Sequence, residues 1–336
     1  MKRKIVLFFI IFLLLIGCLI LGKKKNINKN ITKVRLAEVT HSAFYAPLYV
    51  AIENGYFKEE GLDIELILTP GADKVSAAVL SNDVEVGFAG AESAIYIYTG
   101  GEKDYLQIFS GLTKRDGQFI IGREKKDFTL KDLKGKEILV GRKGGMPALN
   151  FLNALKNEGV DPKDIDINYS IDFASLGGSF IGKTGDYVNL FEPTATMIEK
   201  EGQGYILTSI GLLSGEMPYT AFYARRSYIN DNKEVIEKFT RAIAKGLTYT
   251  LNNDSRTVAN VILPQFPSIS LDDLTNIVEN YKKADSWLLN PYINETIFKN
   301  LEDIMIDNNL LDDYVNYNDL VNNFYNEWFI RSKGFK

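Results

Sequence analysis

Strand-like and helix-like segments alternate along most of the chain, and this alternation constrains the fold more than any other feature. Between residues 34 and 112, short apolar runs predict strands at 34–39, 62–68, 84–88 and 105–112, and longer amphipathic runs predict helices at 46–54, 73–80 and 93–98. Gly55 is placed to end the first of these helices. Alternation at this spacing is typical of a mostly parallel sheet flanked by helices.

The alternation begins again after residue 131, which predicts a second and smaller α/β unit. Its strands are expected at 137–140, 165–169, 187–190 and 205–209, with helices at 147–157, 173–181 and 194–199. Two extended segments, 118–123 and 219–224, bracket this unit, and we expect them to be hinge strands between two lobes. The first lobe would then be discontinuous, residues 33–121 plus 222–336, and the second lobe would cover residues 122–221. A chain of this length is long enough for two domains.

Beyond residue 227 the pattern becomes helical. Amphipathic helices are predicted at 233–251, 255–263, 271–287, 296–308 and 318–329, and Pro264 and Pro267 interrupt the series. We expect these helices to return to the first lobe and pack on it.

The first 25 residues have the form of an export signal. Three basic residues, 2–4, precede an uncharged apolar run, 5–21, that contains Leu-Ile-Gly-Cys at 15–18. This sequence resembles the lipobox that the bacterial lipoprotein signal peptidase recognises. We therefore expect residues 1–17 to be a signal peptide and residues 18–32 to be a lipidated Cys18 with a tether, which places the protein on the extracytoplasmic face of the cell membrane. An uncleaved membrane anchor is the alternative, since the apolar run approaches spanning length.

Composition excludes several classes of function. Cys18 is the only cysteine and His41 the only histidine, which argues against disulfides, thiolate clusters and multi-histidine metal sites. We predict no metal and no cofactor. Without the three basic residues of the leader, 36 basic side chains face 43 acidic ones. That balance argues against a nucleic-acid partner, which would require clustered lysine and arginine.

Several segments resemble one known family. They are THSAFYAPLYVA at 40–51, NGYFKEEGLDI at 54–64, SNDVEVGF at 81–88, LKDLKGK at 130–136 and GDYVNLFEPT at 185–194. They are similar to solute-binding proteins of ABC importers, both of the nitrate, sulfonate and taurine type and of the thiamine-pyrimidine and riboflavin type. The resemblance covers residues 33 to about 260. It implies a two-lobed, type II periplasmic-binding-protein fold, with a ligand between the lobes. The implied partners are an ABC permease and its ATPase subunits, and we expect the protein to be a monomer.

In open α/β sheets, ligands bind beyond the carboxyl ends of strands, close to helix N-termini. The first loop in that position contains His41, Phe44 and Tyr45. His41 is either a ligand contact or a structural histidine, and the rings of Phe44 and Tyr45 could enclose a flat ligand or could serve packing alone. The second contains Glu92 and Ser93. A glutamate in a first helical turn is also favoured by the helix dipole, so a purely structural role for Glu92 remains open.

The third loop, with Arg142, Gly144 and Gly145, could cradle an anion, although a plain strand–turn–helix connection also uses glycines. A fourth set lies near the predicted crossovers and strand ends of the second lobe. It comprises Asp116, Gln118, Gly177, Glu192, Glu216 and Tyr219.

Carboxylates beside aromatic rings suit a flat ring that bears amines or a positive charge. We therefore expect thiamine or its pyrimidine precursor as ligand, then riboflavin, and as a further alternative aliphatic sulfonates, taurine or nitrate. A pyrimidine-forming enzyme of eukaryotic thiamine synthesis shares the fold but carries a cysteine-rich motif, which this chain lacks. We predict no catalytic residues; an exported enzyme and a membrane-tethered sensor are the alternatives.

Overall fold

The structure is a computed structural model and describes residues 31–324. The expected signal peptide, Cys18 and all of the expected tether except its last two residues lie outside this range, as do residues 325–336. Among the described residues, no helix is long and apolar enough to cross a membrane.

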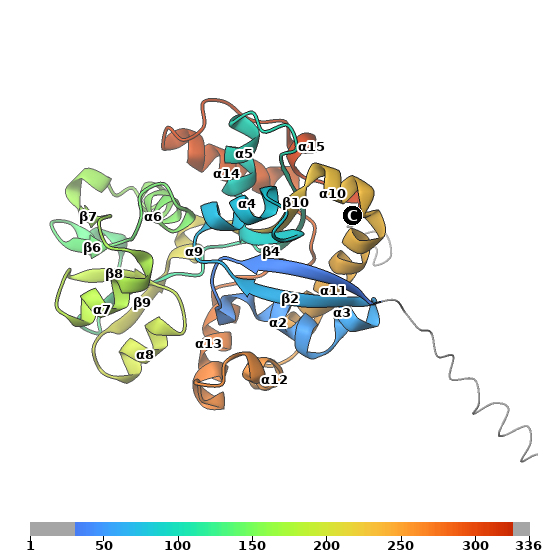
Figure 1. Ribbon diagram of the computed structural model, residues 1–336. Coiled ribbons are helices and arrows are strands. Elements are labelled where there is room, and N and C mark those ends of the chain that lie inside the picture. Colours follow the sequence, from blue (N-terminus) through green and yellow to red (C-terminus); the bar gives the residue numbers. More distant parts are fainter. Residues whose placement is uncertain (1–30, 325–336) are drawn as a thin grey trace, which may run out of the picture. The chain divides into compact units, whose positions relative to one another are not determined.

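The first sheet has five strands in the order β2-β1-β3-β10-β4 (Figure 1). β1 pairs in parallel with β2 and β3, whereas β10 is antiparallel to both β3 and β4. Apolar residues dominate the strands, and β3 and β4 are buried along their whole length because helices cover both faces. The strand bounds are β1 (Thr32–Glu38), β2 (Leu62–Leu68), β3 (Val86–Gly90), β4 (Leu106–Thr113) and β10 (Thr220–Arg225).

The second sheet repeats this design in the order β7-β6-β8-β5-β9. β6 is parallel to β7 and β8, and β5 is antiparallel to β8 and β9. In each sheet the antiparallel strand is the first one after the chain has crossed from the other sheet. Two mixed sheets flanked by helices confirm the expected fold class. The bounds are β5 (Phe119–Gly122), β6 (Glu137–Leu139), β7 (Asp166–Asn168), β8 (Tyr187–Leu190) and β9 (Tyr205–Ser209).

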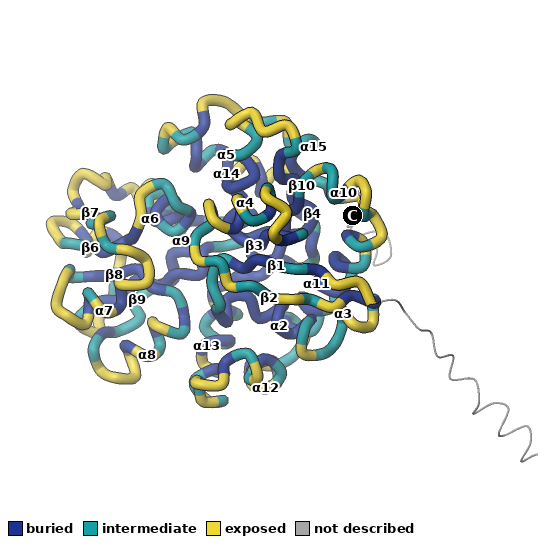
Figure 2. The backbone as a smooth tube through the Cα atoms, in the orientation of Figure 1, coloured by how far each residue is buried: buried dark blue, intermediate teal, exposed yellow. Residues whose placement is uncertain are grey.

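Short helices follow the strands of both sheets, and the buried residues concentrate on the strands and on the helix faces that cover them (Figure 2). In the first lobe these are η1 (Ala43–Tyr45), α2 (Ala46–Glu53), α3 (Tyr56–Glu59), α4 (Ala72–Leu80) and α5 (Glu92–Thr99). In the second lobe they are η2 (Leu130–Leu133), α6 (Met146–Asn157), η3 (Pro162–Asp164), η4 (Phe173–Ser175), α7 (Leu176–Ile181), α8 (Thr194–Lys200) and α9 (Ile210–Ser214).

The C-terminal helices are α10 (Arg226–Asp231), α11 (Lys233–Asn252), α12 (Ser255–Ile262), α13 (Leu271–Lys283), α14 (Glu295–Asp307) and α15 (Tyr317–Leu320), with η5 (Leu263–Gln265) after α12. α11 buries Ile236, Phe239, Ile243 and Leu247, an apolar stripe at helical spacing, and it packs against α2, α3 and β4. Each of these side chains contributes about 1.5–3 kcal/mol by burial. α13 and α14 also reach the second lobe, where they contact α8 and α6.

Two predicted helices are wrong in extent. The helix expected at 271–287 ends at Lys283, because Trp287 instead pairs as a β-bridge with Thr113. The helix expected at 318–329 is described only as far as residue 324; Tyr317–Leu320 is helical, residues 321–323 are not, and residue 324 is helical again. Val321 leaves it to form a bridge with Ile108 of β4. In both cases a contact distant in sequence overrides the local helical pattern.

Candidate functional site

Phe44 lies at the centre of an aromatic cluster that draws on both lobes. It belongs to the turn η1, which closely follows β1, and its side chain is fully buried. Its ring centroid lies 5.6 Å from that of Phe191, which follows β8, and 5.7 Å from that of Tyr219, which precedes β10. Tyr45 extends the cluster, with ring centroids 5.5 Å from Phe44 and 4.4 Å from Phe88. These separations suit favourable ring–ring contacts.

Two hydrogen bonds and one glycine hold this cluster in place. The Trp287 indole nitrogen donates to the Phe44 carbonyl over 2.8 Å, and the Ser42 hydroxyl donates to the Glu192 carbonyl over 2.9 Å. The chain first crosses from one sheet to the other at residues 114–118, between β4 and β5, and this segment is the first crossover. At Gly117 in this segment, an added Cβ would lie only 2.7 Å from the Phe44 ring. The crossover therefore needs glycine here, because no other residue leaves room for the ring.

Glu92 brings a buried carboxyl to this region. It is the first residue of α5, only 4% of its surface is exposed, and its Oε2 atom has no hydrogen-bond partner. Burial raises the pKa of Glu92 to about 7, and the positive charge of Arg142 in the second lobe acts against this rise. The carboxyl folds back over Gly90, where an added Cβ would lie 2.0 Å from Oε2. The next residue, Ser93, is buried and hydrogen-bonds to Tyr223.

Asp116 supplies a second buried carboxyl from the first crossover. Its Oδ1 atom accepts a 2.5 Å bond from the Gln118 backbone nitrogen, whereas Oδ2 has no partner. Burial raises the pKa of Asp116 to about 8, and the hydrogen bond from the Gln118 backbone and the nearby Tyr219 hydroxyl act in the opposite direction. Burial also raises the pKa of Tyr219, and the negative charges of Asp116 and Glu92 raise it further. The two carboxyls and this tyrosine are therefore close enough to interact.

The loop after β6 faces α5 across the lobes. Tyr96 of α5 donates its hydroxyl to the Gly144 carbonyl over 3.4 Å, and the charge of Arg142 acts on both Tyr96 and Glu92. Gly144 has a φ of +81°, a left-handed conformation that favours glycine. Gly145 is the N-cap residue of α6, and no side chain caps that helix end. Arg142 itself is exposed to solvent.

His41 has a different environment. One ring nitrogen, Nδ1, lies 2.7 Å from Glu38 Oε1, and the other, Nε2, lies 3.0 Å from the Gln265 carbonyl. The hydrogen bond to Glu38 raises the pKa of His41. Tyr49 completes the group by donating its hydroxyl to the other Glu38 oxygen over 2.8 Å. Both ring nitrogens thus have protein partners that join β1 to η5.

Glu192 is buried like Glu92, but its carboxylate is fully engaged. It accepts hydrogen bonds from the backbone and hydroxyl of Thr196, each 2.8 Å long, and from the amide of Asn280 over 2.8 Å. The side chain therefore serves the start of α8 and ties it to α13. Burial raises the pKa of Glu192 nevertheless.

Glu216 and Gly177 also lie apart from the aromatic cluster. Glu216 forms ion pairs of 3.0 Å with Lys114 and 3.1 Å with Arg115, so it joins the second crossover to the first. At Gly177 an added Cβ would lie 2.8 Å from Thr194 Cγ2, which makes this glycine a contact point between α7 and α8. The structure thus brings together Phe44, Tyr45, Glu92, Ser93, Asp116, Gln118 and Tyr219, with the Arg142–Gly145 loop facing them. For all of these residues a role in ligand binding remains a prediction.

Two residues beyond the predicted set join this region, since Phe191 packs on Phe44 and Tyr223 contacts Ser93. A further unpredicted residue, Asn189 of β8, is fully buried with both amide atoms unpaired. An asparagine in the middle of an apolar strand was the one available signal for Asn189. Among residues 31–324, no group of three or more histidine, cysteine, aspartate or glutamate side chains is placed to hold a metal ion.

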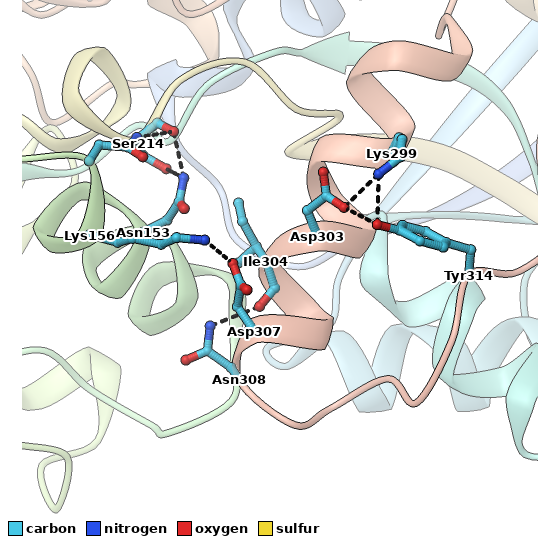
Figure 3. Close-up of polar contacts among 10 residues, drawn as sticks. Asn153, Lys156, Ser214, Lys299, Asp303, Ile304, Asp307, Asn308 and Tyr314 are labelled. Carbon is cyan, nitrogen blue, oxygen red and sulfur yellow. Dashed lines mark hydrogen bonds and ion pairs between the residues drawn. The ribbon is translucent and has the colours of Figure 1, made fainter.

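An ion pair links the lobes at their periphery (Figure 3). Lys156 of α6 bonds to Asp307 of α14, and both side chains are largely exposed. A second pair of this kind joins Lys200 of α8 to Asp273 of α13 over 2.7 Å. Exposed pairs contribute little each, about 0–1 kcal/mol, so they bias the arrangement of the lobes without locking it.

Comparison with known proteins places these features in context. Residues 43–257 match the protein family described as NMT1/THI5 like. YtlA of Bacillus subtilis (strain 168), whose name describes it as a binding protein, is 42% identical over 296 residues, which cover 88% of this chain and 89% of YtlA.

Two further proteins are more distant. The formylaminopyrimidine-binding protein of Halalkalibacterium halodurans is 23% identical over 300 residues, covering 78% of this chain and 88% of its own length. The solved structure of the alkanesulfonate-binding protein SsuA from Xanthomonas axonopodis pv. citri, bound to MOPS, superposes with a TM-score of 0.69 at 16% identity. That match covers 87% of this chain and 98% of the SsuA chain, and it shows a shared fold.

Proposed function

Because this chain belongs to the NMT1/THI5-like family, as a substrate-binding protein with the periplasmic-binding-protein fold, we propose that it captures a small, planar, amine-bearing solute for an ABC-type importer. Thiamine or its pyrimidine precursor is the first candidate. The receptor would be anchored through a lipidated Cys18 on the extracytoplasmic face of the membrane and would deliver its solute to a permease.

The observation that carries this proposal is the pair of buried carboxyls beside aromatic rings. Glu92 and Asp116 each keep one oxygen without a partner, and the rings of Phe44, Tyr45 and Tyr219 lie next to them. A buried, unpaired carboxyl oxygen is costly unless a ligand donates to it. Exocyclic amines of a flat heterocycle supply such donors, while the ring itself packs on aromatic faces.

The same groups disfavour a sulfonate or nitrate. An oxyanion needs several hydrogen-bond donors around it, whereas an ionised carboxyl offers only acceptors and a like charge, and a protonated one offers a single donor. Arg142 is the cation whose charge acts on the pKa of Glu92, and its side chain is exposed. A phosphate ester on the solute could be bound by this arginine and by the uncapped start of α6.

Capture would proceed by a shift between open and closed arrangements. In the structure the lobes touch around the site, through Ser42 and Glu192 and through Tyr96 and Gly144. Entry of a solute requires these contacts to open. A solute that bridges both lobes binds the closed arrangement better and stabilises it, and the closed arrangement would be the form that docks on the permease.

Isothermal titration calorimetry of the detergent-solubilised full chain tests the ligand. We expect thiamine, its hydroxymethylpyrimidine or formylaminopyrimidine to give a binding isotherm that fits a single binding site. Riboflavin is the second choice. Binding of taurine or an alkanesulfonate, without any heat from thiamine or the pyrimidines, would overturn the proposed ligand class. Mass spectrometry of the recovered solute checks for catalysis, because a receptor returns its ligand unchanged.

Two variants and one control locate the site. Glu92→Gln and Tyr45→Leu are each expected to weaken binding at least about tenfold, since a hydrogen bond to a charged group or a large ring contact is lost. Glu85→Gln is the control, because Glu85 is ion-paired with Arg35 at the opposite end of β3. Unchanged affinity in both site variants would remove these residues from the site.

Anchoring has its own test. Cells that produce the full chain are labelled with radioactive palmitate and fractionated. The wild type should carry label in the membrane fraction, and Cys18→Ser should not. Equal labelling of both proteins argues against lipidation at this residue.

A further inference from the structure

Two buried amides beside the second sheet, Gln118 directly before β5 and Asn189 within β8, have no partner for either polar atom. Gln118 and Asn189 are both 0% exposed, and neither their amide oxygens nor their amide nitrogens form a hydrogen bond. Among residues 31–324, the other side chains with an unpaired buried atom are hydroxyl residues and the single carboxyl oxygens of Glu92 and Asp116. Native proteins provide a hydrogen-bond partner for nearly all buried polar groups, so two amides with both polar atoms unpaired require an explanation.

The two amides lie on one face of the second sheet. β5 pairs with β8 so that Ile120 stands opposite Asn189, and side chains of opposite residues share a face. Gln118 precedes Ile120 by two residues and therefore has the same orientation. Its diagonal relation to Asn189 is within reach of long side chains. Ile120 packs in one cluster with Ala148 of α6, so this face lies beneath that helix.

The amides also continue the site already described. The backbone nitrogen of Gln118 donates to Asp116 Oδ1, and Asp116 in turn interacts with Tyr219, which packs against Phe44. Unpaired atoms are thus found in Glu92 of the first lobe, in Asp116 and Gln118 of the first crossover, and in Asn189 of the second lobe.

We propose that Gln118 and Asn189 form a specificity-determining amide pair, which binds an edge of the solute where hydrogen-bond donors and acceptors alternate. This inference rests on the proposed function and refines it. A carboxylate only accepts and a guanidinium only donates, whereas a primary amide presents one acceptor and one NH₂ group side by side. Aminopyrimidines and pyrimidinediones carry such alternating edges. A sulfonate or nitrate offers acceptors alone and would leave the amide oxygens unpaired.

Asn150 provides a matched control within the same lobe. Like Asn189, it is 0% exposed, but it donates to the Met146 carbonyl over 3.0 Å and accepts from the Ser214 hydroxyl over 2.7 Å. Removing a paired amide destabilises a protein, whereas replacing an unpaired one by an apolar group of similar shape is neutral or stabilising. The two asparagines therefore separate a structural role from a ligand-binding one.

The experiment compares Asn189→Leu, Gln118→Met and Asn150→Leu in the full chain. Without ligand, the Tm of Asn150→Leu should be lower than that of the wild type by on the order of 3 °C or more. The Tm values of the other two variants should be unchanged or raised. Titration with thiamine, hydroxymethylpyrimidine, formylaminopyrimidine and riboflavin should show at least about tenfold weaker binding for Asn189→Leu and for Gln118→Met.

Two results would overturn the inference. One is a ligand-free Tm for Asn189→Leu and Gln118→Met as low as that of Asn150→Leu, which would mean that the amides are satisfied within the protein. The other is affinity within about twofold of the wild type in both variants. If the wild type binds none of these solutes, the proposed function fails, while the melting comparison still decides whether the amides are unpaired in the protein.

Discussion

Replacing Glu92 by glutamine should stabilise the ligand-free protein at neutral and alkaline pH. The carboxyl of Glu92 ionises at its ordinary pKa of 4.5 in the unfolded chain, but burial raises its pKa to about 7 in the folded protein. Between these values the folded protein still holds a proton that the unfolded chain has released. Stability therefore falls as the pH rises through this window, and the penalty is complete above pH 7.

The size of the effect follows from the difference between the two pKa values. At about 1.4 kcal/mol for each pH unit, it amounts to about 3 kcal/mol at pH 8 and vanishes near pH 4.5. Glutamine does not ionise, so Glu92→Gln escapes the penalty. For a chain of this size, the gain corresponds to roughly 5 °C or more in Tm at pH 8. The same variant should bind its solute more weakly, because the proposed role of this carboxyl is to accept hydrogen bonds from the ligand.

Differential scanning calorimetry of wild type and Glu92→Gln at intervals from pH 5 to pH 8 measures this difference. Glu85→Gln is a control for which the opposite change in stability is expected. Burial alone would raise the pKa of Glu85, but hydrogen bonds from Arg35 more than offset this and lower it. Glu85→Gln should therefore lose stability at neutral pH. Parallel Tm curves for wild type and Glu92→Gln across the whole range would refute the reasoning, because they would mean that Glu92 ionises normally in the folded protein.

Three further predictions concern the contacts around the site. Lys156→Met combined with Asp307→Asn removes an exposed ion pair between the lobes and should change solute affinity by no more than about fivefold, as titrations at low and high salt can verify. Gly246→Ala should cost about 2–3 kcal/mol in urea unfolding, because its Cβ would lie 2.2 Å from a backbone carbonyl of α2; a loss under about 0.5 kcal/mol would contradict this packing. The pKa of His41 is raised by its hydrogen bond to Glu38, so the stability it contributes is fully present below pH 6.5 and is lost as the pH rises through the raised pKa. His41→Gln should therefore lower Tm more at pH 5.5 than at pH 9, and an equal loss at both would argue against the charged pair.

Much of the fold could be predicted because the local pattern and the tertiary structure agree. The strands at 62–68, 187–190 and 205–209 have the predicted bounds, and each begins directly after a glycine or a charged residue. The helix expected to reach Trp287 ends early because that indole is needed against Phe44, far away in the chain. No periodicity in residues 271–287 contains that information.

The site was predictable only in part, for a similar reason. Phe44, Glu92 and Asp116 follow strands of their sheets, and the parallel design brings such positions together. Glu192 also follows a strand, but Asn280, 88 residues further along the chain, takes up its carboxylate. Asn189 was not predicted for a different reason. What distinguishes it is that both of its amide atoms lack a hydrogen-bond partner in the folded protein, and the sequence does not show this.

The position of β10 in the first sheet has a consequence for the order in which the protein can be completed. This strand lies between β3 and β4, yet the chain reaches it only after all strands of the second lobe have been made. Until then the facing sides of β3 and β4 have unpaired backbone groups and exposed apolar side chains. A nascent chain that stops short of residue 220 can assemble the second lobe, while the first lobe remains incompletely folded and prone to aggregate. The final third of the polypeptide thus acts as the closing piece for the part that was synthesised first.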